Sequence, residues 1–443
     1  MNIQQEIKED AEYLAQKYMR LLFQPASFVA GETYIPVAKA VFDEDELAGL
    51  IEASIRFKMV DGDITDKFER EMQHFLGIRS ATLVNSGSSA NLLAIMALTS
   101  PLLGERSLKP GDEIITNAVG FPTTVAPILQ AGCIPVFVDC NIGSYNPMSY
   151  TIEDAITEKT KAIFLAHTLG NPFDLDQVKS ICEQNELWLI EDCADALGTK
   201  WGGKYVGTFG AIATTSFYPA HMMTTGEGGM VFTDYPLLSS IVRSFRDWGR
   251  ACWCPPNRDN TCGKRFGHKN LGELPDYYDH KYVYSHLGYN LKSTDLQASI
   301  GLEQLKKLPE FIEKRKYNFR YLLQEFIKYE LDKYFVLPFH NILADVVPFG
   351  FPLTIKEGKL DRNKLVQYLE ENKIGTRPLF GGNLTRHPAF VGKGRIHEDN
   401  LPKADIITTN SFWIGCHPGM DSEMIDYVVS IFRNFVEKTT NED

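Results

Sequence analysis

Short runs of apolar residues alternate with stretches of helical periodicity up to about residue 235, and this alternation constrains the fold more than any other feature. Four runs are rich in Ile, Val, Leu or Phe and have the length of buried strands: Glu113–Thr116, Pro135–Val138, Ala162–Ala166 and Leu187–Glu191. Helix-like segments such as Leu175–Gln184 lie between them. Strands separated by helices usually pair in parallel, so the sequence predicts an α/β fold with a mostly parallel sheet and helices on both faces.

Polar clusters follow these runs at the points where the predicted strands end. They are Asn117–Thr124, His167–Asn171 and Asp192–Asp195. In an open parallel sheet, ligands bind beyond the carboxyl ends of the strands. A ligand site is therefore expected at this edge of the sheet.

Composition and charge narrow the class of protein. The chain has 443 residues, of which 44% are hydrophobic, and a formal net charge of −12, which argues against a protein that coats nucleic acid. No run of about 18 apolar residues predicts a membrane span, and the first 20 residues lack the apolar stretch of a signal peptide. Eight cysteines in a chain of this length do not suggest a disulfide framework, so we expect a cytoplasmic protein.

The pattern along the chain predicts four regions. They are an N-terminal helical arm (1–40), a large ligand-binding domain (41–250), a cysteine-containing loop (251–287) and a small C-terminal α/β domain (288–443). A long helix is expected to start near Ser293, where a Ser-Thr-Asp cluster offers an N-cap. The basic run Lys314–Lys316 lies in this helix opposite apolar positions, which predicts a solvated face.

One candidate phosphate site is the segment Asn85-Ser-Gly-Ser-Ser-Ala-Asn91, between the apolar runs Ala81–Val84 and Leu92–Leu98. Small hydroxyl and glycine residues at a helix N-terminus expose backbone N–H groups to a phosphate, although the same pattern also suits a simple capped turn. Ser216 offers a second hydroxyl, and the glycines of 226–229 permit a close backbone approach.

A second candidate is the acidic end of the run Leu187-Trp-Leu-Ile-Glu-Asp192. An acid at this position can cap the next helix. It can also hold a protonated pyridine nitrogen, because a nearby carboxylate raises the pKa of that nitrogen.

Together these motifs resemble the sugar aminotransferase family DegT/DnrJ/EryC1/StrS, which has the aspartate aminotransferase (fold type I) architecture of PLP-dependent transferases. The resemblance covers about residues 35 to 435. The motifs that carry it are Gly87-Ser88, Glu191-Asp192, Ser216-Phe217, Gly226-Glu-Gly-Gly229, Gly288-Tyr-Asn290, Leu296-Gln297 and Ile300-Gly301.

The resemblance implies a pyridoxal or pyridoxamine 5′-phosphate cofactor and a role for each matching residue. Gly87, Ser88 and Ser216 would bind its phosphate and Asp192 its ring nitrogen, while Phe121 would stack on the ring. Asp195 and Tyr218 would flank the cofactor. Asn290 would reach the phosphate from the partner subunit of a homodimer.

The departure from the family pattern is at His221, where the family has its Schiff-base lysine five residues after Ser216. Histidine cannot form that bond to the cofactor, but it can act as a base near neutral pH. This change resembles the nucleotide-sugar 3-dehydrases, which remove the C3 hydroxyl of a nucleotide-linked 4-keto-6-deoxyhexose on pyridoxamine phosphate. An inactive paralogue, a non-catalytic nucleotide-sugar or cofactor binder and a plain sugar aminotransferase are the alternatives.

Two kinds of enzyme share this histidine. One regenerates its cofactor with glutamate and acts on a GDP-sugar. The other carries a [2Fe–2S] cluster, takes electrons from a flavin/iron–sulfur reductase and acts on CDP-4-keto-6-deoxyglucose, towards 3,6-dideoxysugars of lipopolysaccharide O-antigen. The chain resembles the second kind through Phe245–Arg250 and the three cysteines Cys252, Cys254 and Cys262.

The cysteine motif is incomplete, because Arg258 stands at the position matched to the family's third cysteine. A [2Fe–2S] centre on three thiolates would take a fourth ligand from Asp259, Arg258 or His268. A zinc site and a loop without metal are the alternatives. Arg377, Lys264 and Arg265 are candidate contacts for the substrate diphosphate, or solvated or structural residues; the five other cysteines are expected to pack in the core.

Overall fold

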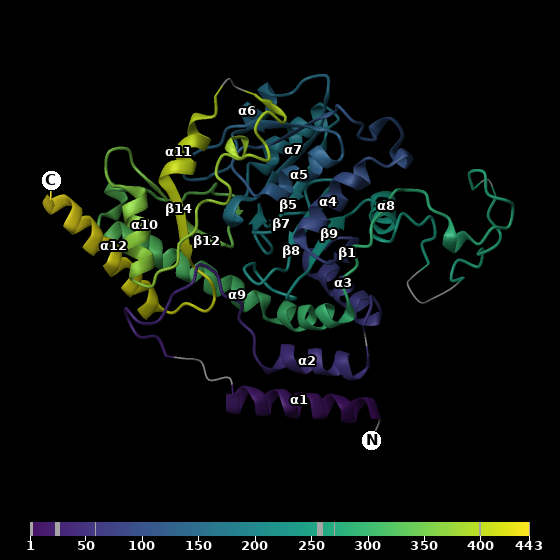
Figure 1. Cartoon of the computed structure of the whole chain (residues 1–443), viewed down its shortest axis with the longest axis horizontal. Coiled ribbons are helices and arrows are strands. Elements are labelled where there is room, and N and C mark those ends of the chain that lie inside the picture. The colour runs from purple at the N-terminus through teal and green to yellow at the C-terminus, as the bar shows by residue number, and fades with distance from the viewer. Residues whose placement is uncertain are drawn as a thin grey trace.

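The structure is a computed structural model that describes residues 3–22, 27–57, 59–254, 260–269, 271–397 and 400–442. Within these residues, the central feature is an eight-stranded sheet of order β1-β9-β8-β5-β4-β2-β3-β13 (Figure 1). Its strands are β1 (Ser80–Val84), β2 (Glu113–Asn117), β3 (Ile134–Val138), β4 (Thr160–Ala166), β5 (Trp188–Asp192), β8 (Ile212–Ser216), β9 (Gly229–Thr233) and β13 (Arg395–Ile396).

The sheet is mostly parallel, as predicted. Pairs β13–β3, β3–β2, β2–β4, β4–β5 and β5–β8 are parallel, and β9 runs antiparallel to both of its neighbours. Each of the four strands expected from the sequence is present within two residues of its predicted bounds. These strands could be predicted because burial on both faces makes each of them a continuous apolar run. Leu189 packs into one hydrophobic core, and its neighbour Ile190 packs into another on the opposite side of the sheet.

Helices cover both faces of this sheet, which confirms the predicted fold class. They are α3 (Asp63–Leu76), α4 (Gly87–Leu98), α5 (Pro122–Gln130), α6 (Ser149–Asp154), α7 (Leu175–Gln184) and α8 (Pro236–Arg246). Helix α7 has the predicted bounds. Asp174 caps its N-terminus by accepting a hydrogen bond from the Gln177 N–H, and its buried side chains include Leu175 and Val178.

A smaller antiparallel sheet lies towards the C-terminal part of the chain, with its own core around Phe326, Phe351 and Phe432. Its strands are β10 (Phe335–Val336), β12 (Gly350–Ile355) and β14 (Ser411–Gly415), and helices α10 (Arg362–Glu371), α11 (Pro402–Asn410) and α12 (Ser422–Glu442) surround it. A third small sheet joins β6 (Lys200–Trp201), β7 (Lys204–Tyr205) and β11 (Ala344–Asp345).

The long helix α9 (Asp295–Lys328) links the region of the eight-stranded sheet to that of the smaller C-terminal sheet (Figure 1). It begins where the sequence predicts, because Thr294 is its N-cap and forms a capping box with Gln297. Its first half packs on α3 and on α2 (Glu44–Ile55), and its second half packs on α12.

The sequence prediction for the basic run on this helix was wrong for one residue. Arg315 is only 1% exposed, although Lys314 and Lys316 on either side reach solvent. Arg315 lies on the buried side of α9, between Ile312 and Asn318, so the run does not form a uniformly solvated face.

The two peripheral segments are the N-terminal helix and the cysteine-containing loop. Helix α1 (Ile3–Leu22) lies along α2 at the outer side of the molecule (Figure 1). The loop projects from the far end of α8, and its described part contains the short 3₁₀ turn η3 (His280–Tyr282). No helix among the described residues is long and apolar enough to cross a membrane.

In the described part of the chain, four further 3₁₀ turns connect these elements. They are η1 (Pro101–Arg106), η2 (Thr168–Gly170), η4 (Leu331–Lys333) and η5 (Leu384–Arg386).

Candidate active site

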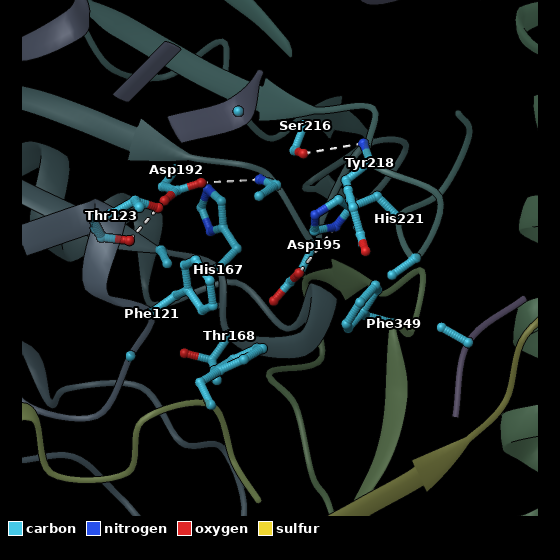
Figure 2. A pocket seen from close by; sticks show the side chains of 18 of the residues that line it. Phe121, Thr123, His167, Thr168, Asp192, Asp195, Ser216, Tyr218, His221 and Phe349 are labelled. Carbon is cyan, nitrogen blue, oxygen red and sulfur yellow. Dashed lines mark hydrogen bonds and ion pairs between the residues drawn. The ribbon is translucent and has the colours of Figure 1, made fainter. Parts of the chain in front are cut away.

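A cavity of about 650 Å³ opens at the carboxyl edge of the large sheet, where the sequence predicts the ligand site (Figure 2). Eight of the predicted site residues line it: Gly87, Ser88, Phe121, Asp192, Asp195, Ser216, Tyr218 and His221. They end or follow β1, β2, β5 and β8, whose carboxyl ends lie at the same edge of the sheet. Side chains from the smaller sheet and the segments beside it, including Phe349 and Trp413, close the other side of the cavity.

One end of the cavity is the N-terminus of α4. Ser86 is the N-cap and accepts a hydrogen bond from the Ser89 N–H at 3.1 Å. Gly87 passes so close to Ser216 that a Cβ at residue 87 would overlap the Ser216 side chain. The first N–H groups of a helix lack intrahelical partners and carry a partial positive charge, so this end suits a phosphate.

Another part of the cavity wall is the buried carboxylate of Asp192. It accepts hydrogen bonds from the Asn91 amide and the Thr124 hydroxyl, both at 2.8 Å, and from the Ala194 N–H at 3.1 Å. Burial raises the pKa of Asp192, although these hydrogen bonds oppose the rise. Because all three donors are neutral, the carboxylate suits a ligand that brings a positive charge, such as a protonated ring nitrogen.

Glu191 and His167 form a buried pair next to Asp192. Glu191 accepts hydrogen bonds from the Gly207, Phe209 and Gly210 N–H groups and lies 3.2 Å from His167 Nε2. Burial alone would raise the pKa of Glu191, but the contacts from His167 and the backbone lower it below its usual value. An ionised carboxylate only accepts, so Nε2 of His167 is the donor.

A turn places His221 over the cavity. Its backbone N–H donates to the Tyr218 carbonyl at 2.9 Å, and Pro219 occupies the second position of the turn, where its fixed φ is favourable. His221 Nδ1 lies 3.4 Å from Asp195 Oδ1 without forming a hydrogen bond, and Figure 2 shows the two side chains facing each other. The imidazole also stacks on the Phe349 ring, with centroids 5.2 Å apart.

The remaining predicted cofactor residues are less enclosed. Phe121 and Tyr218 line the cavity but are 54% and 52% exposed. Asn290 does not line the cavity of its own chain; it is exposed, bridges to Asp247, and its side-chain oxygen accepts from Lys292 Nζ at 2.6 Å.

The three basic residues suggested as diphosphate contacts are placed differently. Arg377 lines the cavity. Arg265 forms an ion pair with Asp279 inside the cysteine loop, at 2.6 Å, and Lys264 precedes it there. Neither loop residue lines this cavity.

The three loop cysteines lie in a half-exposed segment away from the cavity. Hydrogen bonds, chiefly from the Thr261 side chain and also involving Cys252 and Cys262, lower the pKa of Cys254 to about 7. Arg258 and Asp259 lie outside the described residues. His268, the third suggested ligand, packs its ring against His280 with centroids 3.8 Å apart.

Among the described residues, one group of three or more possible metal ligands has its atoms within 4.8 Å: His167, Glu191 and Cys193. Their side chains are buried, and Glu191 already accepts hydrogen bonds from the backbone. The five cysteines outside the loop are buried, as expected for core positions.

A family model for the DegT/DnrJ/EryC1/StrS aminotransferase family matches residues 42–433. The chain belongs to this family. It is 51% identical over 430 residues to the lipopolysaccharide biosynthesis protein RfbH of Salmonella typhimurium (97% of this chain and 98% of the relative). It is 50% identical over 415 residues to dTDP-4-dehydro-2,6-dideoxy-D-glucose 3-dehydratase of Saccharopolyspora spinosa (94% and 89%).

Solved structures give the same assignment. GDP-4-keto-6-deoxy-D-mannose-3-dehydratase of E. coli with bound hydrated PLP superposes with a TM-score of 0.81 at 29% identity, covering 90% of this chain and all of that one. A structure of GDP-4-keto-6-deoxymannose-3-dehydratase with a trapped PLP–glutamate geminal diamine gives a TM-score of 0.80 at 30% identity, with 90% and 100% covered. The family and fold predicted from the motifs are therefore confirmed.

For a member of this aminotransferase family, the structure adds site residues that sequence reasoning did not single out. Asn91 and Thr124 hold Asp192, and Asn91 itself accepts from the Thr214 hydroxyl at 2.6 Å. Asn91 ends the candidate phosphate segment and Thr124 ends the polar cluster Asn117–Thr124, so both lie in motifs that the sequence shows. Phe349 had none, because it comes from a distant segment beside the smaller sheet.

Proposed function

We propose that this chain catalyses the pyridoxamine phosphate-dependent removal of the C3 hydroxyl from a nucleotide-linked 4-keto-6-deoxyhexose. The observation that carries the proposal is His221, a histidine over the cavity at the place where the family has its lysine. Relatives named as nucleotide-sugar 3-dehydratases, at 50% and 33% identity, support the same reaction class.

Two parts of the cavity wall fit the cofactor. Gly87, Ser88 and Ser216 would bind the phosphate at the α4 N-terminus, and Asp192 would hold the ring nitrogen in its protonated form. Phe121 would stack on the ring, and Asp195 and Tyr218 would flank it, in place of the covalent tether that a lysine provides. When bound, the cofactor supplies an amine for the C4 ketone and a ring that accepts the electrons released by deprotonation.

His221 is the base. Its Nδ1 faces the Asp195 carboxylate, which favours the tautomer with hydrogen on Nδ1 and a free lone pair on Nε2. Nε2 would take the proton from C4′ of the cofactor, and the C3 hydroxyl would then take up that proton and leave the sugar as water. A positioned general base typically contributes about 10²- to 10⁴-fold to such a step.

The substrate proposal has two parts. A nucleotide-linked 4-keto-6-deoxyhexose is supported by the relatives, which are named as 3-dehydratases of dTDP- and GDP-sugars. CDP-4-keto-6-deoxyglucose is proposed on the resemblance of Phe245–Arg250 and the cysteine segment to the enzymes of CDP-sugars. Arg377 is the cavity's candidate for the diphosphate.

The test is to incubate the protein with pyridoxamine phosphate and CDP-4-keto-6-deoxyglucose and to identify the products by mass spectrometry and NMR. We expect loss of the C3 oxygen. Release of an amino sugar in the presence of glutamate would contradict the proposal and indicate an aminotransferase.

We further propose that Cys252, Cys254 and Cys262 hold a [2Fe–2S] cluster, which would pass electrons from a flavin/iron–sulfur reductase to the dehydrated sugar and so give the 3-deoxy product. The resemblance of this cysteine segment carries the proposal. The lowered pKa of Cys254 agrees with it because the thiolate is the ligand form, whereas burial raises the pKa of Cys252. Iron and acid-labile sulfide on anaerobically purified protein test it. Absence of iron after reconstitution would instead favour the cluster-free, glutamate-coupled 3-dehydratase.

A homodimer in a cytoplasmic location completes the proposal. Asn290 is exposed and outside the cavity of its own chain, which is compatible with a contact to the phosphate of a partner. The thiols are all unpaired, the usual state in a reducing compartment. Sedimentation velocity tests the dimer: a single species of twice the 50.0 kDa chain mass is expected.

A further inference from the structure

Arg315 on α9 is a buried cation that the proposed reaction does not use. It is 1% exposed, and within the described ranges its hydrogen-bond acceptors are three backbone carbonyls rather than carboxylates. Its Nε has no partner in the part of the chain that the structure describes. Burial lowers the pKa of Arg315 from its ordinary value. A buried arginine without a carboxylate bonded to it is costly, which calls for a specific role.

The acceptors show what Arg315 joins. One terminal nitrogen donates to the carbonyl of His221 itself at 3.0 Å. The other donates to the carbonyls of Phe349 at 3.1 Å and of Pro348 at 3.4 Å. The guanidinium therefore links the backbone of the proposed base to the backbone of the aromatic residue on which its imidazole stacks.

The two segments that Arg315 links are far apart in the sequence and belong to different sheets. His221 lies in the loop between β8 and β9 of the large sheet, and Phe349 immediately precedes β12 of the smaller one. The Phe349 N–H donates to the Leu169 carbonyl at 3.0 Å, and the Phe349 carbonyl accepts from Arg315. Both backbone polar groups of Phe349 are therefore hydrogen-bonded. A guanidinium has two terminal nitrogens in fixed geometry, which a lysine cannot reproduce.

We infer that Arg315 is a positioning residue: its guanidinium holds the His221 backbone and the Phe349 ring in register, so that the imidazole stays over the cavity facing Asp195. This inference rests on the proposed role of His221 as base. Arg315 does not line the main cavity and acts through His221. Since small misplacements of a catalytic group can cost about 100-fold in rate, loss of the Arg315 guanidinium should lower kcat selectively.

The kinetic test compares Arg315→Lys and Arg315→Met with the wild-type holoenzyme. Lysine should lower kcat about tenfold and methionine about 100-fold, while KM for the sugar and Kd for the cofactor stay within twofold. Arg320→Gln, an exposed arginine on the same helix, is the matched control and should leave all three unchanged. A kcat within twofold of wild type in folded Arg315→Lys would overturn the inference, as would a parallel loss of cofactor affinity.

A structural readout keeps this test separate from the proposed function. In a crystal structure of the Arg315→Lys holoenzyme, the His221 imidazole should leave the Phe349 ring and move away from Asp195. An imidazole in its original place would overturn the inference whether or not the wild type removes the C3 hydroxyl. If the methionine variant does not fold, the lysine variant decides both measurements.

Discussion

The cavity and the cysteine loop hold their reactive groups in opposite ways. Asp192 is buried and fixed by three hydrogen bonds from separate segments of the large sheet region. Cys254 lies in a projecting loop, next to Trp253, which is 67% exposed. Folding alone organises the cavity, whereas the cysteine loop would depend on a bound cluster to join its thiols.

The strongest test of the organised site is Asp192→Asn. An amide cannot carry the negative charge that keeps a ring nitrogen protonated, so turnover should fall about 10²- to 10³-fold at saturating cofactor. Steady-state kinetics measures the loss, and Asp176→Asn on the exposed side of α7 is the control. Full activity of Asp192→Asn would refute the role given to this carboxylate.

Gly87→Ala tests the phosphate end. The added Cβ would overlap the Ser216 side chain and push α4 away from β8, so cofactor affinity should weaken about tenfold. Equilibrium dialysis measures the affinity. Gly267→Ala is the control, because its Cβ would have no neighbour nearer than 3.8 Å. Unchanged affinity in Gly87→Ala would place the phosphate elsewhere.

The loop is tested by thiol alkylation of iron-free protein across a pH series. The thiolate reacts, and the pKa of Cys254 is lowered to about 7, so its rate should rise tenfold per pH unit below pH 7 and level off above it. Burial raises the pKa of Cys252, so Cys252 should react more slowly than Cys254 at pH 7. Peptide mass spectrometry gives both rates, with buried Cys193 as the unreactive control. Equal alkylation rates for Cys252 and Cys254 would contradict the predicted difference between their pKa values.

The smallest effect is expected from Phe349→Leu. Leucine keeps most of the apolar contact and loses the ring stack on His221, worth about 0.5–1.5 kcal/mol, so kcat should fall roughly two- to tenfold. Phe339→Leu, at an exposed aromatic outside the cavity, is the control. A KM effect without a kcat effect would assign Phe349 to substrate binding instead.

Sequence reasoning succeeded where one segment carries the whole signal. The strands of the large sheet are apolar runs because both faces are buried, and the start of α9 is marked by its own capping residues. Cavity residues such as Gly87 and Asp192 could be predicted from the sequence for the same reason. Gly87 begins a helix and Asp192 ends a strand, each within its own motif.

The missed features depend on contacts between distant segments. Arg315 looks like part of a basic surface run, and its burial follows from His221 and Phe349, which lie 94 and 34 residues away in the chain. The pairing of Glu191 with His167 likewise spans two strands. No local pattern encodes such partners, because only the packed sheet brings them together.

The central claim is that His221 is the base, and the exchange of the C4′ proton of pyridoxamine phosphate tests it most directly. With deuterium at C4′ and the nucleotide sugar present, the wild type should exchange the label into water. His221→Asn should exchange about 10²- to 10⁴-fold more slowly, with its melting temperature and cofactor affinity retained. Exchange at the wild-type rate in His221→Asn would contradict the account.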